Sequence, residues 1–208
     1  MEYNLPRKYL SYSQFALWNS SKESYRKRYY LGEKPFETKE TAFGRKTDDH
    51  LDNGGTIEGV INYGNPQFEI NYVYKGIPIF GKLDDFCTKE FRILERKTGH
   101  KNPKGIVPWD AVKVRKHKQL TFYSAMIELQ EGKVHPEVIL QWLETDFKDK
   151  HIEFDGHVLK SNKSELVLTG KVATFKRRIP KWERVKMLKD IIKCAKEISE
   201  DYTLWQNK

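Results

Sequence analysis

The 208-residue sequence contains little cysteine: Cys87 and Cys194 are its only two thiols, and they lie in different halves of the chain. They form no Cys-x-x-Cys pair, so one chain cannot supply the four cysteines of a structural zinc site or an iron–sulfur cluster. Sparse cysteine also suits the reducing cytoplasm better than a disulfide-rich secreted scaffold. We therefore expect a cytoplasmic protein without an iron–sulfur cluster.

Long apolar runs are also missing. No stretch approaches the roughly 20 apolar residues that cross a bilayer, and the N-terminal residues MEYNLPRKYLSYSQ lack the apolar core of a signal peptide. The phosphate-cradling pattern Gly-x-x-x-x-Gly-Lys-Ser/Thr does not occur either. These absences predict no membrane association and no nucleotide-driven motor within this sequence.

Positive charge is abundant and unevenly distributed. The net charge is +9, and residues 89–118 hold ten Lys or Arg against three acids, while residues 171–189 hold eight against one. Each segment is therefore +7, which leaves the rest of the chain at −5. Two concentrated basic segments are typical of a protein that binds a polyanion such as nucleic acid. Solvated surface lysines of an ordinary basic protein are the alternative.

The composition and periodicity predict one folded α/β domain. Hydrophobic residues make up 38% and aromatic residues 13% of the chain, enough for a packed core. Apolar spacing and capping signals predict helices over residues 11–32, 41–52, 109–130 and 180–200, and strands over 67–74, 79–88, 91–98, 136–146, 151–154, 165–168 and 171–175. On the last helix the apolar spacing selects Trp182, Val185, Leu188, Ile192 and Ala195 as the inward face. This order predicts a mixed central sheet flanked by helices, with a core over residues 10–146 and a C-terminal strand and helix extension over 147–208.

The stretch GKLDDFCTKEFRILERKTG places acids and a lysine within strand-like sequence. If it folds as a hairpin with residues 89–90 as the loop, Asp84 lies opposite Glu95. Opposed Cβ atoms are about 4.5–5.5 Å apart, so two carboxylates there repel unless a divalent cation lies between them. Lys97 shares the face of Glu95, whereas Asp85 points to the other face. The pattern predicts a metal site that polarises a phosphate; an edge hairpin with solvated charges is the alternative.

These residues, in this order, resemble the PD-(D/E)XK nuclease superfamily. The segments GKLD and LERKTG look like its core signature. Upstream, LSYSQFALW and AFGRKTDDHLD resemble the N-terminal pattern of the RecB-like, exonuclease-V-like branch, and downstream KHKQLTFYSAMI carries that branch's Gln and Tyr. The resemblance covers roughly residues 10–145 and implies a restriction-endonuclease-like αβββαβ core. The branch often has Cys-Pro after the first helix, where this sequence has NSSKESY.

The resemblance implies a set of ligands for Mg²⁺ or Mn²⁺. Asp84 matches the first acid and Glu95 the second, so they would be the central ligands. His50 would add a nitrogen, the backbone carbonyl of Arg96 would add an oxygen, and Glu69 lies where the family often has another acid. An imidazole ligand suits Mn²⁺ better than Mg²⁺, so we expect Mn²⁺ to support activity at least as well. A surface histidine and a solvated strand glutamate are the alternatives for His50 and Glu69.

The resemblance also assigns the catalytic lysine and a nucleic-acid surface. Lys97 would orient the attacking water and stabilise the developing charge. Gln119 and Tyr123 are spaced i, i+4 on one helical face, where Gln119 would hold a DNA phosphate and Tyr123 would support it. Arg115 falls one turn before Gln119 in the expected helix, and with Lys116 it would contact the backbone of DNA. These assignments give catalytic roles to Asp84, Glu95, Lys97 and Gln119.

The resulting expectation is a metal-dependent nuclease, an exonuclease of DNA recombination, repair or phage replication. If the aromatic first helix and the basic segment 171–189 fold toward the metal, they would form a channel for single strands or duplex ends. Because the sequence has no motor, a helicase or recombination partner is compatible with it. A non-catalytic nucleic-acid-binding module, or a nuclease subunit of a larger assembly, is the alternative on the same fold.

Overall fold

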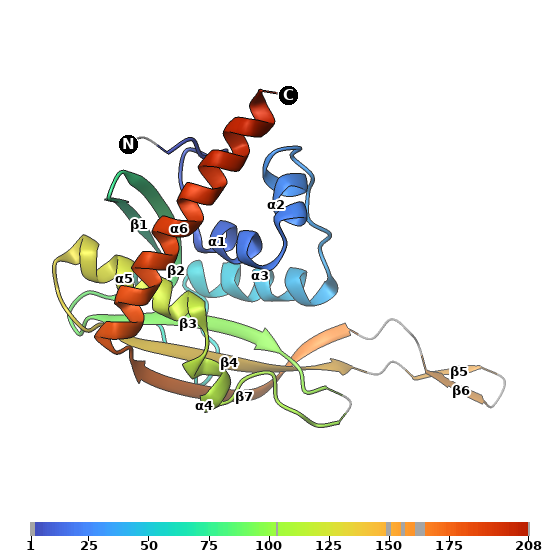
Figure 1. The fold of residues 1–208 in the computed structure, drawn as a ribbon. Helices are drawn as coiled ribbons and strands as arrows, with labels where there is room; N and C mark the ends of the chain where they lie inside the picture. The colour runs from blue at the N-terminus through green and yellow to red at the C-terminus, as the bar shows by residue number, and fades with distance from the viewer. Residues whose placement is uncertain (1–2, 103, 149–150, 155–156, 161–164, 208) are drawn as a thin grey trace.

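A computed structural model describes residues 3–102, 104–148, 151–154, 157–160 and 165–207 (Figure 1). The helices are α1 (Tyr12–Ser20), α2 (Lys22–Tyr29), α3 (Lys39–Asp52), α4 (Ala111–Arg115), α5 (Lys118–Glu131) and α6 (Lys181–Gln206). The strands are β1 (Pro66–Tyr74), β2 (Ile77–Cys87), β3 (Arg92–Gly99), β4 (Glu137–Lys148), β5 (His151–Phe154), β6 (His157–Lys160) and β7 (Glu165–Arg178). In the described part of the chain, no helix is long and apolar enough to cross a membrane.

Five strands form a mixed sheet in the order β1-β2-β3-β4-β7. The first three strands form an antiparallel meander, β4 runs parallel to β3 after a crossover through α4 and α5, and β7 returns antiparallel to β4. Strands β5 and β6 pair separately as a two-stranded hairpin that projects from the far end of β4 and β7 (Figure 1). The predicted fold class, a mixed central sheet with flanking helices, is therefore confirmed.

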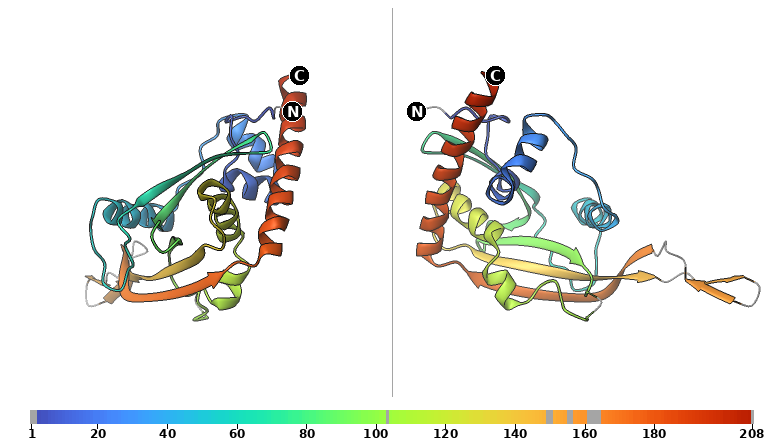
Figure 2. Two further views of the ribbon diagram at one scale, coloured as in Figure 1. Left: turned by 90° about the vertical axis from the view of Figure 1, so that its left-hand side faces the viewer. Right: turned by 45° about the vertical axis from the view of Figure 1, so that its right-hand side comes forward.

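Helix α5 occupies the middle of the core. Residues 120–127 are all buried, which is the pattern of a helix enclosed on every side rather than amphipathic. It lies over the sheet, and the long helix α6 packs along it and against α1, as both views of Figure 2 show. Helix α3 lies over the same face of the sheet near β1 and β3. The space over β2 and β3 is thus bounded by α3 and α5.

Two predicted helices are each divided in the structure. The expected helix 11–32 breaks at Ser21, whose extended backbone ends α1 and whose side chain caps α2 by accepting from Ser24 N. The expected helix 109–130 breaks at Lys116 and His117, so α4 and α5 have separate axes. Serine favours such an N-terminal cap because its hydroxyl satisfies a free backbone N–H. The apolar spacing in the sequence continues across both breaks, so it predicted one helix in each case.

The C-terminal extension contributes to the core. The two short strands expected over 165–175 are one continuous strand, β7, which provides the fifth strand of the sheet. At the start of α6 the residues expected to face inward do not: Trp182 is 67% and Val185 40% exposed. The expected Ala195 is buried, and the expected Leu188 and Ile192 are partly buried against the core. The other buried positions of α6 are Arg184, Met187, Ile191, Cys194 and Ile198. Arg184 is buried because its guanidinium pairs with Glu128 of α5 at 2.5 Å, which holds the start of α6 on that helix.

Candidate metal and catalytic site

The β2–β3 hairpin has the register expected from sequence. Asp85 pairs with Leu94, Phe86 with Ile93, and Cys87 with Arg92. Residues 88–91 form the turn, so the loop is longer than the two residues expected while the register is unchanged. The next position along this register joins Asp84 and Glu95, and the backbone N–H of Arg96 donates to Asp84 Oδ2 at 2.6 Å. The two acids therefore lie side by side at the centre of the sheet.

Glu95 and Lys97 point to the face of the sheet that carries α3 and α5. The Glu95 side chain is only 2% exposed, and its Oε1 is paired with the ammonium of Lys97. Its second oxygen, Oε2, is buried without a hydrogen-bond partner in the residues the structure describes. An unpaired buried carboxylate oxygen is costly unless a cation or a donor arrives to satisfy it. That oxygen is therefore available to a ligand.

A third carboxylate, Asp48, joins this pair from α3. Asp48 lines the same cleft as Lys97, and its charge interacts with Asp84. Gly44, one turn earlier, permits the approach, since a Cβ there would lie 3.0 Å from Thr98 Oγ1 of β3. Sequence reasoning missed Asp48. The spacing of Thr47 and Leu51 could have indicated it. These two residues lie i, i+4 on the buried side of α3, so Asp48 and Asp52, which follow each of them, lie next to the side that faces the sheet.

The three carboxyl groups have raised pKa values because they are buried close together. Desolvation, followed by repulsion from Asp84, raises the pKa of Asp48 to about 7 and that of Glu95 to about 8. Burial also raises the pKa of Asp84, although Lys97 opposes the shift. The ammonium of Lys97 has a raised pKa because Glu95 and Asp84 outweigh its own desolvation, so it stays charged at neutral pH. Lys97 thus faces three carboxyl groups that repel one another, and the charge of Arg96 also acts on Asp48 and Asp84.

The structure does not bring His50 or Glu69 to this cluster, which corrects both assignments. His50 is exposed at the end of α3, and its ring covers the backbone of Gly55, with Nε2 3.5 Å from Thr56 O. Two residues along a helix rotate a side chain by about 200°, so His50 turns away from the sheet that Asp48 faces. Glu69 is exposed on β1 and pairs with Lys82 at 3.3 Å.

Gln67 takes the place on β1 that had been expected for Glu69. It lies between Pro66 and Phe68, which pair with Asp85 and Leu83, so it is the β1 residue nearest to Asp84 in the register. Its side-chain Nε2 donates to Asp52 Oδ2 at 2.8 Å, and it lines the cleft. The cleft has a volume of about 750 Å³ between α3 and the strands.

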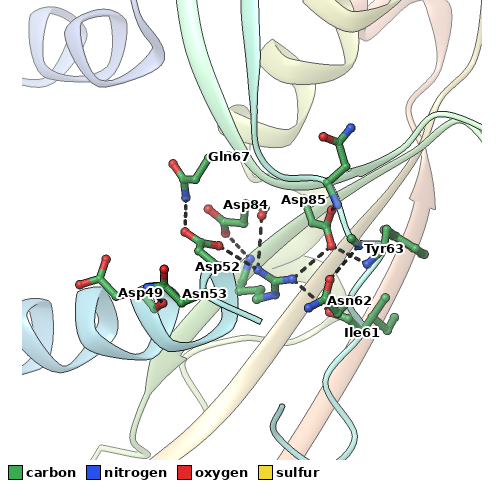
Figure 3. A network of polar contacts seen from close by, with 12 residues as sticks. Asp49, Asp52, Asn53, Ile61, Asn62, Tyr63, Gln67, Asp84 and Asp85 are labelled. Carbon is green, nitrogen blue, oxygen red and sulfur yellow. Dashed lines mark hydrogen bonds and ion pairs between the residues drawn. The ribbon is translucent and has the colours of Figure 1, made fainter. Parts of the chain in front are cut away.

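Asp85 belongs to a network of polar contacts next to Asp84 (Figure 3). Arg96 joins this network to the cleft, which it also lines, and its guanidinium lies 4.0 Å from Asp52 Oδ1 of α3. Asp85 is fully buried and accepts from Tyr63 N at 2.6 Å, from Asn65 N at 3.1 Å, and from the Arg96 guanidinium at 3.4 Å. The same guanidinium donates to the backbone oxygen of Asp84 at 3.3 Å. Asp85 is therefore a structural neighbour, and the Arg96 side chain holds the backbone of the first acid in place.

Gln119 and Tyr123 share one face of α5, as their spacing predicted. Gln119 Nε2 donates to the Tyr123 hydroxyl at 3.2 Å. Tyr123 is 6% exposed and packs over Gly81 of β2, where a Cβ would lie 3.2 Å from the tyrosine ring. The charges of Glu95, Asp84 and Lys97 all act on its hydroxyl, which places this pair beside the cluster of carboxyl groups and Lys97.

Arg115 and Lys116 are exposed and are not on the Gln119 face. Arg115 ends α4, whose axis is separate from that of α5, and its backbone oxygen accepts from Arg177 of β7. The expectation of a continuous Arg115–Gln119 helical face is wrong for this reason. Both basic side chains remain free to contact solvent or a ligand at the junction of α4 and α5.

The residues present suit a hard divalent cation, although the cluster is not yet arranged around one. Among the residues that the structure describes, no three His, Cys, Asp or Glu side chains converge as a formed metal site. Asp48, Asp84 and Glu95 nevertheless supply only carboxylate oxygens, which Mg²⁺ and Mn²⁺ prefer. Glu95 Oε2 has no hydrogen-bond partner among the described residues, and burial followed by repulsion from Asp84 raises the pKa values of Asp48 and Glu95. A cation bound between these groups would offset both costs.

Comparisons with known proteins identify structural neighbours only. No family model matches the sequence, and no curated protein matches it. A crystal structure of a protein from Eubacterium rectale, provisionally named an exonuclease, matches with a TM-score of 0.56 at 10% identity, over 94% of this chain and 82% of that one. A phage-related exonuclease from Haemophilus somnus 129PT matches with a TM-score of 0.53 at 12% identity, over 90% and 82%. The protein therefore has the fold of these exonuclease structures.

Proposed function

We propose that the protein is a metal-dependent nuclease that hydrolyses phosphodiester bonds of DNA. The observation that carries this proposal is the gathering of Asp84, Glu95 and Lys97 on one face of the sheet, with Asp48 entering from α3 and one oxygen of Glu95 left unpaired. The resemblance of the motifs and the names of the two structural neighbours support the same conclusion independently.

Asp48, Asp84 and Glu95 would hold the metal ion, which would neutralise the phosphate and provide hydroxide near neutral pH. Arg96 is adjacent in the chain to Glu95, so its backbone carbonyl stays a proposed further ligand. Because His50 lies away from the cluster, the donor set is oxygen-rich and fits Mg²⁺ and Mn²⁺ alike. The earlier expectation of an imidazole-based preference for Mn²⁺ loses its support.

The protein's own residues would position the substrate. Lys97 stays protonated and is 30% exposed at its side chain, so its ammonium can reach a phosphate oxygen or the attacking water while Glu95 anchors it. Gln119 donates its amide to the Tyr123 hydroxyl, on which the charge of Lys97 also acts. Charge that develops on the phosphate would thus meet donors already fixed in place.

Exonuclease action is the finer part of the proposal. It rests on the motif resemblance and on the neighbours' names. The aromatic wall expected for a threading channel is not formed by Phe15, Trp18 and Tyr25, since all three are buried in the core. Helix α6 with its basic residues packs on α1 and α5 (Figure 2). End dependence therefore requires a direct test.

Purified protein incubated with end-labelled linear DNA and closed circular DNA, in Mg²⁺, Mn²⁺ or EDTA, tests the proposal. We expect linear DNA to be degraded with either metal, closed duplex circles to survive, and EDTA to stop the reaction. Glu95→Ala and Lys97→Ala should each abolish cleavage, while only Glu95→Ala should weaken metal binding by calorimetry. Cleavage that persists in EDTA would exclude metal catalysis, and rapid nicking of circles would indicate an endonuclease with the same residues.

A non-catalytic nucleic-acid-binding module is the second candidate. Wild-type protein that binds DNA but leaves it intact with both metals would support it. The retained Glu95–Lys97 pair favours catalysis, because a module that only binds DNA has no need of a lysine held against a buried carboxylate.

A further inference from the structure

Tyr12 lies beside the catalytic cluster, although neither the motif resemblance nor the helix periodicity assigned it a role. It is the first residue of α1 and is half-buried. Its ring packs edge-on against Phe122 with centroids 5.7 Å apart, and lies 6.3 Å from the rings of Phe15 and Tyr123. These contacts join the first turn of α1 to the N-terminal half of α5, which carries Gln119 and Tyr123.

The segment that carries Tyr12 is held rigidly. Leu10 bridges to β2, with Leu10 N donating to Pro78 O at 2.8 Å and Phe80 N donating to Leu10 O at 3.1 Å. Ser11 caps α1, and the buried Gln14 is fixed by the hydroxyl of Tyr25 at 3.0 Å. A side chain on such a support is positioned before any ligand arrives, which is the requirement for useful transition-state contacts.

The charges of Lys97 and Glu95 act on the hydroxyl of Tyr12, whose ring packs beside that of Tyr123. Burial raises its pKa, the charge of Lys97 opposes that shift, Glu95 adds to it, and the backbone N–H of Gln119 also acts on the hydroxyl oxygen. The hydroxyl is therefore protonated at neutral pH and is a donor, not a base. When a phenol oxygen accepts from an amide N–H, its own proton stays available for another acceptor.

Tyr12 differs from Tyr123 in accessibility. Tyr123 is 6% exposed and its hydroxyl already accepts a hydrogen bond from Gln119, so its role is to hold Gln119 in place. Tyr12 is partly exposed and is acted on by Lys97 and Glu95 as well, so a ligand can reach it. The metal ligand Asp48 comes from α3, whereas Tyr12 comes from α1, so the two approach the sheet from different helices.

We infer that Tyr12 is a further substrate-contacting residue, whose hydroxyl donates a hydrogen bond to a non-bridging oxygen of the scissile phosphate beside Lys97. The inference rests on the proposed nuclease function and deepens it. Together with Lys97 and Gln119, it gives the phosphate three donors, from α1, β3 and α5. No proton is transferred by Tyr12: the O–H bond persists and strengthens its hydrogen bond as negative charge develops.

The test compares Tyr12→Phe with Tyr9→Phe. Tyr9 is also half-buried, three residues earlier, and its ring packs on Phe80 at 5.2 Å. We expect Tyr12→Phe to lower the single-turnover rate on end-labelled linear DNA by about 10–100-fold, below the larger losses seen when an oxyanion donor is removed. Tyr9→Phe should retain the wild-type rate, and both variants should unfold at the wild-type temperature.

A phosphorothioate substitution distinguishes contact from support. Sulfur at the non-bridging position that Tyr12 contacts should slow the wild-type enzyme, and the same sulfur should slow Tyr12→Phe much less, because the contact is already lost. DNA binding in Ca²⁺, read by fluorescence anisotropy, should change by less than about 3-fold in Tyr12→Phe, since the contact strengthens mainly in the transition state.

The outcomes separate this inference from the proposed function. Wild-type cleavage with an unaffected Tyr12→Phe rate rejects the role of Tyr12 and leaves the nuclease intact. A lower rate with an undiminished sulfur effect, or with a lower unfolding temperature, makes Tyr12 a structural residue and also rejects it. A wild-type protein that cleaves no DNA with either metal ion removes the proposed function and this inference with it.

Discussion

Asp48 and His50 are two residues apart on α3, and the helix turns their side chains toward different surroundings. Asp48 faces the cleft and the charge of Asp84, while His50 covers the backbone at Gly55. Only Asp48 is therefore placed to contribute to the proposed metal site. This difference of orientation provides a sharp test of which residues hold the metal.

Asp48→Ala should reduce Mg²⁺-dependent cleavage by at least about 100-fold, because it removes a ligand that the two remaining carboxylates cannot replace. His50→Ala should leave cleavage within about 3-fold of wild type. Calorimetric titration with Mn²⁺ measures the same difference without catalysis. Loss of metal binding in His50→Ala, with none in Asp48→Ala, would restore the assignment made from the motif.

The raised carboxyl pKa values predict how metal-free stability depends on pH. The folded protein holds protons at Asp48 up to about pH 7 and at Glu95 up to about pH 8, whereas the unfolded chain loses them near pH 4–4.5. The folded state binds more protons in this window, so the free energy of unfolding in EDTA should fall as pH rises through it. His117 acts in the opposite sense at lower pH, because burial lowers its pKa to about 4.

Urea unfolding in EDTA between pH 6.5 and 8.5 isolates the carboxyl effect. Wild type should lose stability across this range, Glu95→Gln should lose less, and Mg²⁺ should restore wild type but not the variant. A wild-type stability that rises with pH relative to Glu95→Gln would contradict the raised pKa of Glu95.

At the scale of single elements, α6 shows how burial selects one face of a long helix. Apolar residues occur around much of its circumference, so its sequence permits more than one inward face. The observed face places Met187 and Ile191 in the core and leaves Trp182 exposed. The Arg184–Glu128 ion pair fixes this rotation at the start of the helix.

Met187→Ala should lower the free energy of unfolding by about 2–5 kcal/mol, as expected for a buried side chain whose removal leaves a cavity. Trp182→Ala should change it by no more than about 0.5 kcal/mol, because the ring is mostly in solvent. Chemical denaturation of both variants gives the comparison. The reverse order of effects would support the inward face expected from apolar spacing alone.

At the scale of the whole molecule, the two basic segments of the sequence adjoin one another. Residues 89–118 and 171–189 meet where Arg115 of α4 contacts Arg177 of β7. Two basic segments that are distant in sequence thus adjoin at the junction of α4, α5 and β7. If the proposed function holds, this arrangement would suit a nucleic acid that extends from the cleft along that junction.

The salt dependence of DNA binding measures this contact. The logarithm of the binding constant should fall with the logarithm of salt concentration by about 0.7–0.9 for each phosphate contacted. Replacing Arg115 and Lys116 with Ala should reduce the slope by up to about two such contacts. Replacing Lys193 and Lys196 on α6, which already pair with acids one turn later, should leave the slope unchanged and serves as the charge-matched control.

The sequence by itself determined the properties that depend on short-range periodicity. A period of two along β2 and β3 placed Glu95 and Lys97 on one face and Asp85 on the other. The hairpin register followed from a turn centred on residues 89–90, and the structure has this register with a longer turn. The order of strands and helices likewise gave the mixed sheet. The i, i+4 spacing of Gln119 and Tyr123 predicted their shared face, which the hydrogen bond between them confirms.

Only the tertiary structure decided which helical residues reach the site. The segment TDDHLD offers acids and a histidine on several sides of α3, and the rotation that selects Asp48 comes from Gly44 and Thr47 approaching the sheet. Tyr12 reaches the catalytic cluster because α1 packs on α5, a contact between residues distant in sequence. Strand alternation is a local property of the backbone, whereas the rotation of a helix with polar residues on every side is set by what it packs against.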